Sequence, residues 1–151
     1  SPKKQPVLFF KYFWNKCFGK KKIIFNFYSR EFTVAAYKQA NLILFPSNVE
    51  CSPIVLFECA AAKLPFLATD VGNSVEIAEW TKGGKILPTT KDNDGFSHAV
   101  IGESVKILDK MINDKSELVR MAGESHKIWK EKYSWEHITK MYERLYQDLI
   151  K

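Results

Sequence analysis

The sequence predicts an α/β domain in which helices cover both faces of a parallel sheet. Four short apolar runs are typical of buried strands and lie at 23–27, 41–45, 65–69 and 85–87. Helical segments separate these runs, and such alternation is typical of parallel strands joined by helices. With 151 residues, of which 46% are hydrophobic, the chain is long enough for one domain with a packed core.

Positive charge is concentrated at the start of the chain. Eight of the 23 basic residues and none of the 17 acidic ones lie at or before Arg30. A helix is predicted for 7–19, apolar nearly all round, followed by Lys20, Lys21 and Lys22 at the negative end of its dipole. Two interpretations are open: a basic aromatic surface for anionic lipid, or a sheet-covering helix with solvated lysines. Nucleic acid is not expected as a partner, because no nucleic-acid-binding motif accompanies these lysines.

The cysteines and the hydropathy pattern indicate a location inside the cell. Cys17, Cys51 and Cys59 are an odd number without metal-ligand spacing, which is typical of a reducing compartment. No apolar run approaches the ~20 residues of a membrane helix, and the start lacks a signal-peptide cleavage site. We therefore expect a cytoplasmic protein, located at the inner face of the membrane if the basic segment binds lipid. We read Cys51 and Cys59 as small packing residues rather than nucleophiles.

The most informative stretch follows the predicted strand at 41–45. Ser52 is a favourable helix N-cap and Pro53 a favourable first helical residue, so the apolar segment after them is predicted to be a helix. The N–H groups of Ile54 and Val55 would then lack intrahelical acceptors just beyond the carboxyl end of a strand. Such a helix start is a ready site for a phosphate or another anion.

Two carboxylates lie beside this predicted anion site. Glu50 precedes the helix, and Glu58 points back toward the helix start, because helical side chains lean toward the N-terminus. Carboxylates accept hydrogen bonds from hydroxyl groups, so a ligand with both phosphates and hydroxyls, such as a nucleotide diphosphate sugar, suits this arrangement. The alternative interpretation is that Glu50 is solvated and Glu58 is an ordinary surface residue.

Caps and periodicity predict the other elements. Ser29 is expected to cap a helix over 30–39, Ser74 a helix over 75–80, and Ser134 the last helix, which has a strong apolar stripe. The remaining segments are a polar loop at 89–95 and helices from about 97 to 112 and from 116 to 132. The predicted organisation is therefore a basic aromatic helix (1–22), an α/β domain (23–132) and a C-terminal helix (133–151).

Motifs around the two glutamates resemble those of a known enzyme family. Glu50 and Glu58 are separated by seven residues. Around them stand Phe-Pro-Ser (45–47), Glu-Cys-Ala-Ala-Ala (58–62), Pro-Phe-Leu-Ala-Thr-Asp (65–70) and Val-Gly-Asn (71–73). Together they resemble the C-terminal, donor-binding half of retaining glycosyltransferases with the GT-B fold, family 4 (glycosyl transferases group 1). The resemblance extends from Ile23 to the last helix.

The resemblance implies a fold and an activity. The fold would be a Rossmann-like parallel sheet, the C-terminal half of a GT-B enzyme without its first strand. The full enzyme would transfer a hexosyl group with retention from a UDP- or GDP-linked sugar to a hydroxyl acceptor, in surface polysaccharide or glycoconjugate biosynthesis. The acceptor, a glycan or lipid-linked molecule, would be bound by an N-terminal domain that is absent here, so this chain alone is expected to be inactive. Neither a cofactor nor a metal is expected.

The resemblance also implies roles for individual residues. Glu50 and Glu58 would be catalytic, Glu50 orienting the donor sugar and Glu58 holding the ribose. The other donor contacts would be Ser52, Ile54 and Val55 at the diphosphate and Phe27, Tyr28 and Ser29 near the base.

Some features depart from the family pattern. The family usually has a glycine where Lys63 stands, in a left-handed conformation that costs a lysine roughly 1 kcal/mol, so the turn is expected to differ slightly. Pro53 has no N–H to offer an anion. Two other functions fit the same features: a nucleotide-sugar epimerase that needs no acceptor, and a non-catalytic module that binds a membrane surface through 7–22.

Overall fold

The computed structural model describes residues 29–150. By its internal contacts the chain divides into two units, Ser1–Phe32 and Thr33–Lys151, and the sheet described below belongs to the second unit. Three predicted features lie outside the described residues: the helix at 7–19, the strand at 23–27, and the base-contacting residues Phe27 and Tyr28.

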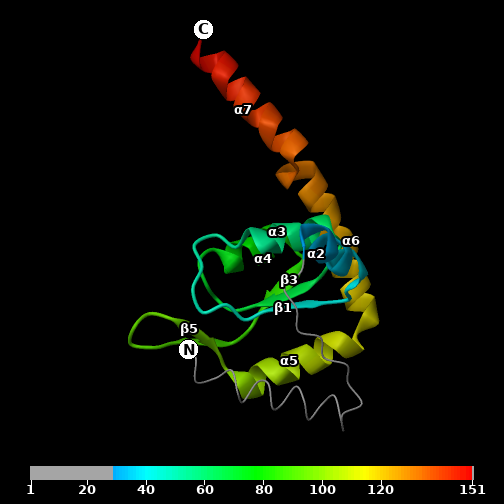
Figure 1. Cartoon of the computed structure of the whole chain (residues 1–151), viewed down its shortest axis with the longest axis vertical. Helices are drawn as coiled ribbons and strands as arrows, with labels where there is room; N and C mark the ends of the chain where they lie inside the picture. Colours follow the sequence, from blue (N-terminus) through cyan, green and yellow to red (C-terminus); the bar gives the residue numbers. More distant parts are fainter. Residues whose placement is uncertain (1–28, 151) are drawn as a thin grey trace. The chain divides into compact units, whose positions relative to one another are not determined.

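Within residues 29–150, three parallel strands form a sheet in the order β1-β2-β3, and Figure 1 labels its two outer strands. The strands are β1 (Ile43–Phe45), β2 (Phe66–Ala68) and β3 (Gly84–Ile86). They confirm the predicted strands at 41–45, 65–69 and 85–87, with small differences at the ends. The central residue Leu67 of β2 is in register with Leu44 of β1 and Lys85 of β3. Because the strands are parallel, their carboxyl ends lie at the same edge of the sheet.

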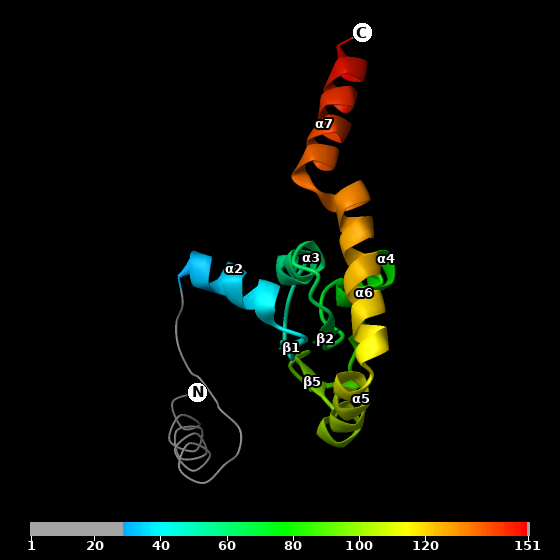
Figure 2. The ribbon, with the colours of Figure 1, turned by 90° about the vertical axis from the view of Figure 1, so that its right-hand side faces the viewer.

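Helices cover both faces of this sheet, as predicted. The helices are α3 (Ile54–Ala61), α4 (Ser74–Thr81), α5 (Ile101–Asn113) and α6 (Lys115–Ile128). Side chains alternate along a strand, so Phe66 and Ala68 pack with residues of α3 and α4 whereas Leu67 packs with Met111 of α5 and Met121 of α6. Figure 2 shows α3 above the strands and α5 below them.

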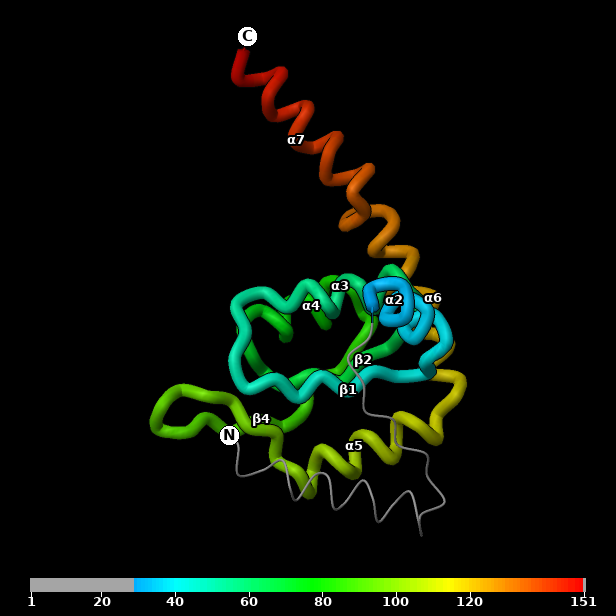
Figure 3. The backbone as a smooth tube through the Cα atoms, viewed as in Figure 1, coloured from blue at the N-terminus to red at the C-terminus, as the bar shows by residue number. Residues whose placement is uncertain are grey.

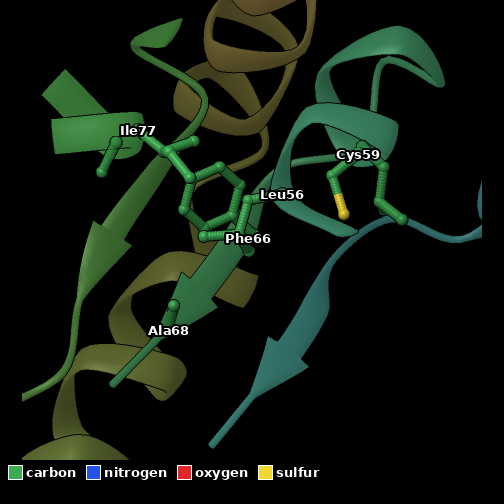
Figure 4. Close-up of a cluster of buried hydrophobic side chains, with 7 residues drawn as sticks. Leu56, Cys59, Phe66, Ala68 and Ile77 are labelled. Atoms are coloured by element: carbon green, nitrogen blue, oxygen red, sulfur yellow. The ribbon is translucent and has the colours of Figure 1, made fainter. Parts of the chain in front are cut away.

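Fully buried side chains hold α3 against the sheet (Figure 4). Leu56 and Cys59 of α3 meet Phe66 of β2 and Ile77 of α4, and all four are 0% exposed. The Phe66 ring lies directly over Gly84 of β3, since a Cβ at that glycine would be 2.2 Å from ring carbons. Burial raises the pKa of the Cys59 thiol to about 12. This cysteine is therefore a packing residue and not a reactive thiol. Cys51 is exposed in the loop before α3, so the prediction that it is also a packing residue is wrong.

The turn after α3 keeps the left-handed conformation that a glycine would adopt there. Lys63 has φ +59°. Its N–H donates to the Ala60 carbonyl at 3.3 Å, and the Leu64 N–H donates to the Cys59 carbonyl at 2.9 Å. These are the two bonds of a Schellman motif, which closes a helix through one left-handed residue. The expectation that lysine would alter this turn is therefore wrong.

Replacement of Lys63 by glycine is expected to stabilise the protein by about 1 kcal/mol, because the left-handed strain of the lysine disappears. Denaturant unfolding measures this gain. The matched control is Lys106→Gly, in the middle of the exposed face of α5, where the same substitution is expected to cost about 1 kcal/mol. A loss of stability in Lys63→Gly would contradict the conformation described here.

The segment predicted as a polar loop at 89–95 belongs instead to a hairpin. Its antiparallel strands are β4 (Thr89–Lys91) and β5 (Ser97–Ala99). The turn between them is organised by Asp92, whose Oδ1 accepts hydrogen bonds from the N–H groups of Asp94 at 3.0 Å and Phe96 at 2.9 Å. The helix predicted from about Ser97 therefore begins only at Ile101. Apolar periodicity does not reveal this hairpin, because a carboxylate rather than a buried face fixes it.

Of the four predicted serine caps, those at Ser29 and Ser134 are confirmed, and those at Ser52 and Ser74 are wrong. Ser29 Oγ accepts from the Phe32 N–H at 3.4 Å at the start of α2 (Arg30–Gln39). Ser134 accepts from the His137 N–H at 3.3 Å and caps α7 (Trp135–Leu149). Ser74, however, is the first residue of α4, and Asn73 occupies the cap position.

The chain leaves α6 through a π-helix, Trp129–Tyr133, before α7 begins. The single helix predicted over 116–132 is therefore an α-helix followed by one turn of π-helix. The apolar stripe of α7 is exposed, with Trp135 at 81% and Leu149 at 73%. None of the helices in the described part of the chain is both long and apolar enough to cross a membrane.

Candidate functional site

Three loops meet at the carboxyl edge of the sheet, where ligands bind in open α/β domains. The first loop, 46–53, leads from β1 into α3, as Figure 3 shows along the chain. The second, 69–73, leads from β2 into α4, and the third connection is the hairpin that follows β3. Hydrogen bonds between these segments fix the loop that carries Glu50.

The first loop is tied to the end of β2 through Thr69, which is 0% exposed. The Thr69 hydroxyl donates to the Ser47 carbonyl at 2.5 Å. The Ser47 hydroxyl lies 2.9 Å from Glu50 Oε1 and 3.1 Å from the Val49 carbonyl. Thr69 therefore fixes the backbone of Ser47, and the Ser47 hydroxyl in turn holds the Glu50 carboxylate.

Gly72 allows the second loop to approach the first. Its φ is +51°, and a Cβ there would lie 2.2 Å from the Cys51 carbonyl oxygen and 2.9 Å from that of Glu50. The next residue, Asn73, donates its N–H to the Cys51 carbonyl at 3.2 Å. Only a glycine fits this contact, so Gly72 sets the position of the Glu50–Cys51 backbone. In the sequence this glycine belongs to the Val-Gly-Asn motif (71–73), and no role at the site was predicted for it.

The start of α3 differs from its prediction. Ser52 is not the N-cap: Pro53 occupies that position with φ −72° and ψ 91°, and no side chain caps the helix. The extended ψ of Pro53 moves the first helical residue to Ile54. Because Pro53 is buried, its ring packs inward, while Ser52 stays exposed.

The N–H groups at this helix start are available to a ligand. The first residues of an α-helix have no intrahelical acceptors for their N–H groups, which applies here to Ile54 and Val55. Ile54 is 70% exposed and Val55 is half-buried. With no capping side chain to compete, the positive end of the helix dipole faces the loop edge, where an anion is stabilised.

The predicted site residues fall into three groups. Glu50 and Glu58 are both half-buried: Glu50 lies in the first loop, before the helix start, and Glu58 lies in the second turn of α3. Ser52, Ile54 and Val55 form the connection between them. Ser29 belongs to the first unit of the chain, and Phe27 and Tyr28 lie outside the described residues.

The hairpin contributes residues to this edge that were not predicted from the sequence. Asn48 Nδ2 donates to the Ser97 carbonyl at 2.6 Å and lies 3.0 Å from His98 Nδ1. The Ser97 N–H in turn donates to the Asn48 carbonyl at 2.8 Å. His98 Nε2 lies 2.7 Å from Asp92 Oδ2, and this hydrogen bond holds the pKa of Asp92 below its usual value. The sequence did not indicate the contact between His98 and Asn48, because His98 is a single histidine in a polar segment.

Replacement of Thr69 by valine is expected to lower the free energy of unfolding by about 1–2 kcal/mol, because the Ser47 carbonyl loses its donor. The amide resonances of 47–50 should shift as well. Thr81→Val is the matched control, since Thr81 is equally buried and donates to the Ile77 carbonyl at 2.7 Å, within α4. Loss of stability without a change at 47–50 in Thr69→Val would show that Thr69 does not hold this loop.

A separate pocket of about 630 Å³ lies at the opposite, amino edge of the sheet. It is lined by residues before β1 and β2 and by residues of α5 and α6, including Asn41, Lys63, Ile112 and Lys115. This pocket contains none of the predicted site residues.

The fold and this loop edge define a Rossmann-like α/β domain of the GT-B type. The chain belongs to the family of glycosyl transferases group 1, whose sequence model matches residues 8–127. The family resemblance seen in the sequence is therefore confirmed.

Two known proteins illustrate the relationship. The chain is 28% identical over 122 residues to an uncharacterized glycosyltransferase of Methanocaldococcus jannaschii, a match that covers 80% of this chain and 29% of that protein. Its fold is similar to that of sucrose-phosphate synthase from Thermosynechococcus elongatus, with a TM-score of 0.67 and 20% identity, over 98% of this chain and 34% of that one. The chain thus spans about a third of the length of these relatives.

Proposed function

We propose that the carboxyl edge of the sheet binds the nucleotide-sugar donor of a glycosyltransferase. The observation that carries the proposal is the uncapped start of α3, where Ile54 and Val55 offer N–H groups and which lies, along the chain, between Glu50 and Glu58. A diphosphate suits the helix start, and sugar hydroxyls suit the carboxylates. Membership of a glycosyltransferase family favours sugar transfer over the epimerase alternative.

Each residue then has a distinct role toward the donor. The Ile54 and Val55 amides and the Ser52 hydroxyl bind the diphosphate, Glu58 accepts from the ribose hydroxyls, and Glu50 orients the donor sugar. Phe27, Tyr28 and Ser29 contact the base. The donor is a UDP- or GDP-linked hexose, and no metal is needed for this arrangement.

The proposed catalytic contribution of this edge is to stabilise the diphosphate leaving group. As the bond from the sugar to the diphosphate breaks, negative charge develops on the diphosphate and positive charge on the sugar. Fixed amide dipoles at the start of α3 stabilise the diphosphate more strongly as its charge grows, which lowers the barrier. In the full protein the sugar passes with retention to a hydroxyl of a glycan or lipid-linked acceptor, at the cytoplasmic face of the membrane, in surface polysaccharide or glycoconjugate synthesis.

Glu58→Ala in the full-length protein tests this assignment. Donor affinity is expected to fall by roughly tenfold, because a charged acceptor of ribose hydroxyls is lost, and transfer should fall at least as far. Glu103→Ala is the matched control: Glu103 is an exposed acidic residue in the first turn of another helix, α5, and its removal should change neither. Unchanged donor affinity in a folded Glu58→Ala protein would remove Glu58 from the site.

A further inference from the structure

Hairpin β4–β5 is attached to the Glu50 loop mainly through one side chain, Asn48. Its amide nitrogen reaches both the Ser97 carbonyl, at 2.6 Å, and the imidazole of His98, at 3.0 Å. A third hydrogen bond, from the Ser97 N–H to the Asn48 carbonyl at 2.8 Å, joins the two backbones. Asn48 lies two residues before Glu50, so the position of the hairpin is transmitted directly to the proposed sugar-binding carboxylate.

The hydrogen bonds around His98 determine which ring nitrogen carries the proton. Asn48 Nδ2 can only donate, so Nδ1 of His98 must accept and is unprotonated. Nε2 therefore carries the hydrogen and donates to Asp92 Oδ2 at 2.7 Å. The contact to Asn48 exists only while the imidazole is neutral.

Protonation of His98 breaks this arrangement. A charged imidazole has a hydrogen on both nitrogens, so Nδ1 would meet the Asn48 amide donor to donor. Rotation of the Asn48 amide does not solve this conflict, since its oxygen would then face the Ser97 carbonyl oxygen. Either way the Glu50 loop loses one hydrogen bond to the hairpin.

We propose that Asn48 positions the Glu50 loop and that the charge state of His98 controls this attachment, so that donor binding weakens as His98 becomes protonated. This inference rests on the proposed function for its donor-binding half. Histidine is the side chain whose ordinary change of charge falls between about pH 5 and 8.

Two contacts of the His98 ring act on its charge in opposite directions. Asp92, on the same hairpin, is the carboxylate in contact with the imidazole and stabilises its charged form. Lys91 on β4 follows Thr90, the residue in register with His98. From the facing loop, Asn48 contacts the ring and favours the neutral form, and Glu50 is the charged residue of that loop. The His98 and Asp92 side chains are 50% and 38% exposed, so protons reach them freely.

NMR titration of the 151-residue chain from pH 8 to pH 5 tests the attachment without any ligand. The amide resonances of 47–50 are expected to shift with the same midpoint as the His98 imidazole. In Asn48→Ala, His98 should still titrate, but the loop resonances should no longer follow it. Loop resonances that ignore His98 in the unmodified chain, or that follow it in Asn48→Ala, overturn the proposal.

Donor affinity measured over the same pH range tests the consequence. We expect roughly fivefold weaker nucleotide-sugar binding once His98 is charged, the effect of one lost hydrogen bond, and no such dependence in His98→Gln. His137→Gln, a substitution on α7, should retain the dependence of the unmodified chain. If donor affinity has the same pH dependence in His98→Gln, the proposal that His98 controls donor binding is wrong. Absence of nucleotide binding at every pH overturns the proposed function and the donor-binding half of this inference, while the ligand-free titration still decides whether His98 controls the loop.

Discussion

Replacement of Gly72 by alanine is expected to lower the free energy of unfolding by about 2–5 kcal/mol and to abolish donor binding. Two costs add. An alanine at φ +51° is strained, and its Cβ would lie 2.2 Å from the Cys51 carbonyl oxygen. The Cys51 atoms in the way belong to the backbone, so no change of side-chain rotamer relieves the overlap. The Glu50–Cys51 segment must move, and with it the proposed sugar-binding carboxylate.

Gly95→Ala is the matched control for this prediction. Gly95, in the hairpin turn, also has a positive φ, +82°, but a Cβ there meets nothing within 4 Å. Both variants therefore carry the strain of an alanine at positive φ, but only Gly72→Ala places a Cβ against the Cys51 backbone. Denaturant unfolding should show the larger loss in Gly72→Ala, and nucleotide binding should survive in Gly95→Ala. Equal losses in the two variants would mean that contact with Cys51 does not constrain the loop.

Replacement of Phe66 by alanine is expected to cost about 3–5 kcal/mol, the largest loss of stability that a single side chain of this core should give. Phe66 is 0% exposed, in the central strand, and its ring fills the space over Gly84 and beneath Leu56 of α3. Removing it leaves a cavity that the short strands cannot collapse to fill. Since small domains have only about 5–15 kcal/mol in total, this variant should be close to unfolding.

Phe96→Ala serves as the control, because Phe96 is 42% exposed on the hairpin. Its replacement should change the free energy of unfolding by no more than about 0.5 kcal/mol. Circular dichroism during urea unfolding measures both variants. A loss below 1 kcal/mol in Phe66→Ala would contradict the description of the core.

The sequence was sufficient for the sheet and its covering helices. The central strand Phe66–Ala68 is buried on both faces and therefore appears as a continuous apolar run, and β1 and β2 are each followed by a segment that the sequence predicts to be a helix. The family motifs also located the loop before α3. These features depend on local sequence, so local reasoning was able to find them.

What the sequence did not reveal depends on contacts between distant residues. Asn48 and His98 are 50 residues apart, and Thr69 and Ser47 are 22 apart, yet their hydrogen bonds shape the loop edge. Gly72 was visible in the sequence as part of the Val-Gly-Asn motif, but its close approach to Cys51 appears only in three dimensions. The cap at Pro53 was missed because Ser52 has the stronger intrinsic preference, which the buried proline overrides.

The most direct test of the donor site is an NMR titration of this chain with UDP, GDP, ADP and their sugar-linked forms. We predict that one nucleotide class shifts amide resonances clustered at 50–58, with the largest changes at Ile54 and Val55. Shifts clustered instead around Lys63 and Lys115, at the pocket on the amino edge, would contradict the assignment of the site. So would a folded chain that shows no shifts with any of these ligands at millimolar concentration.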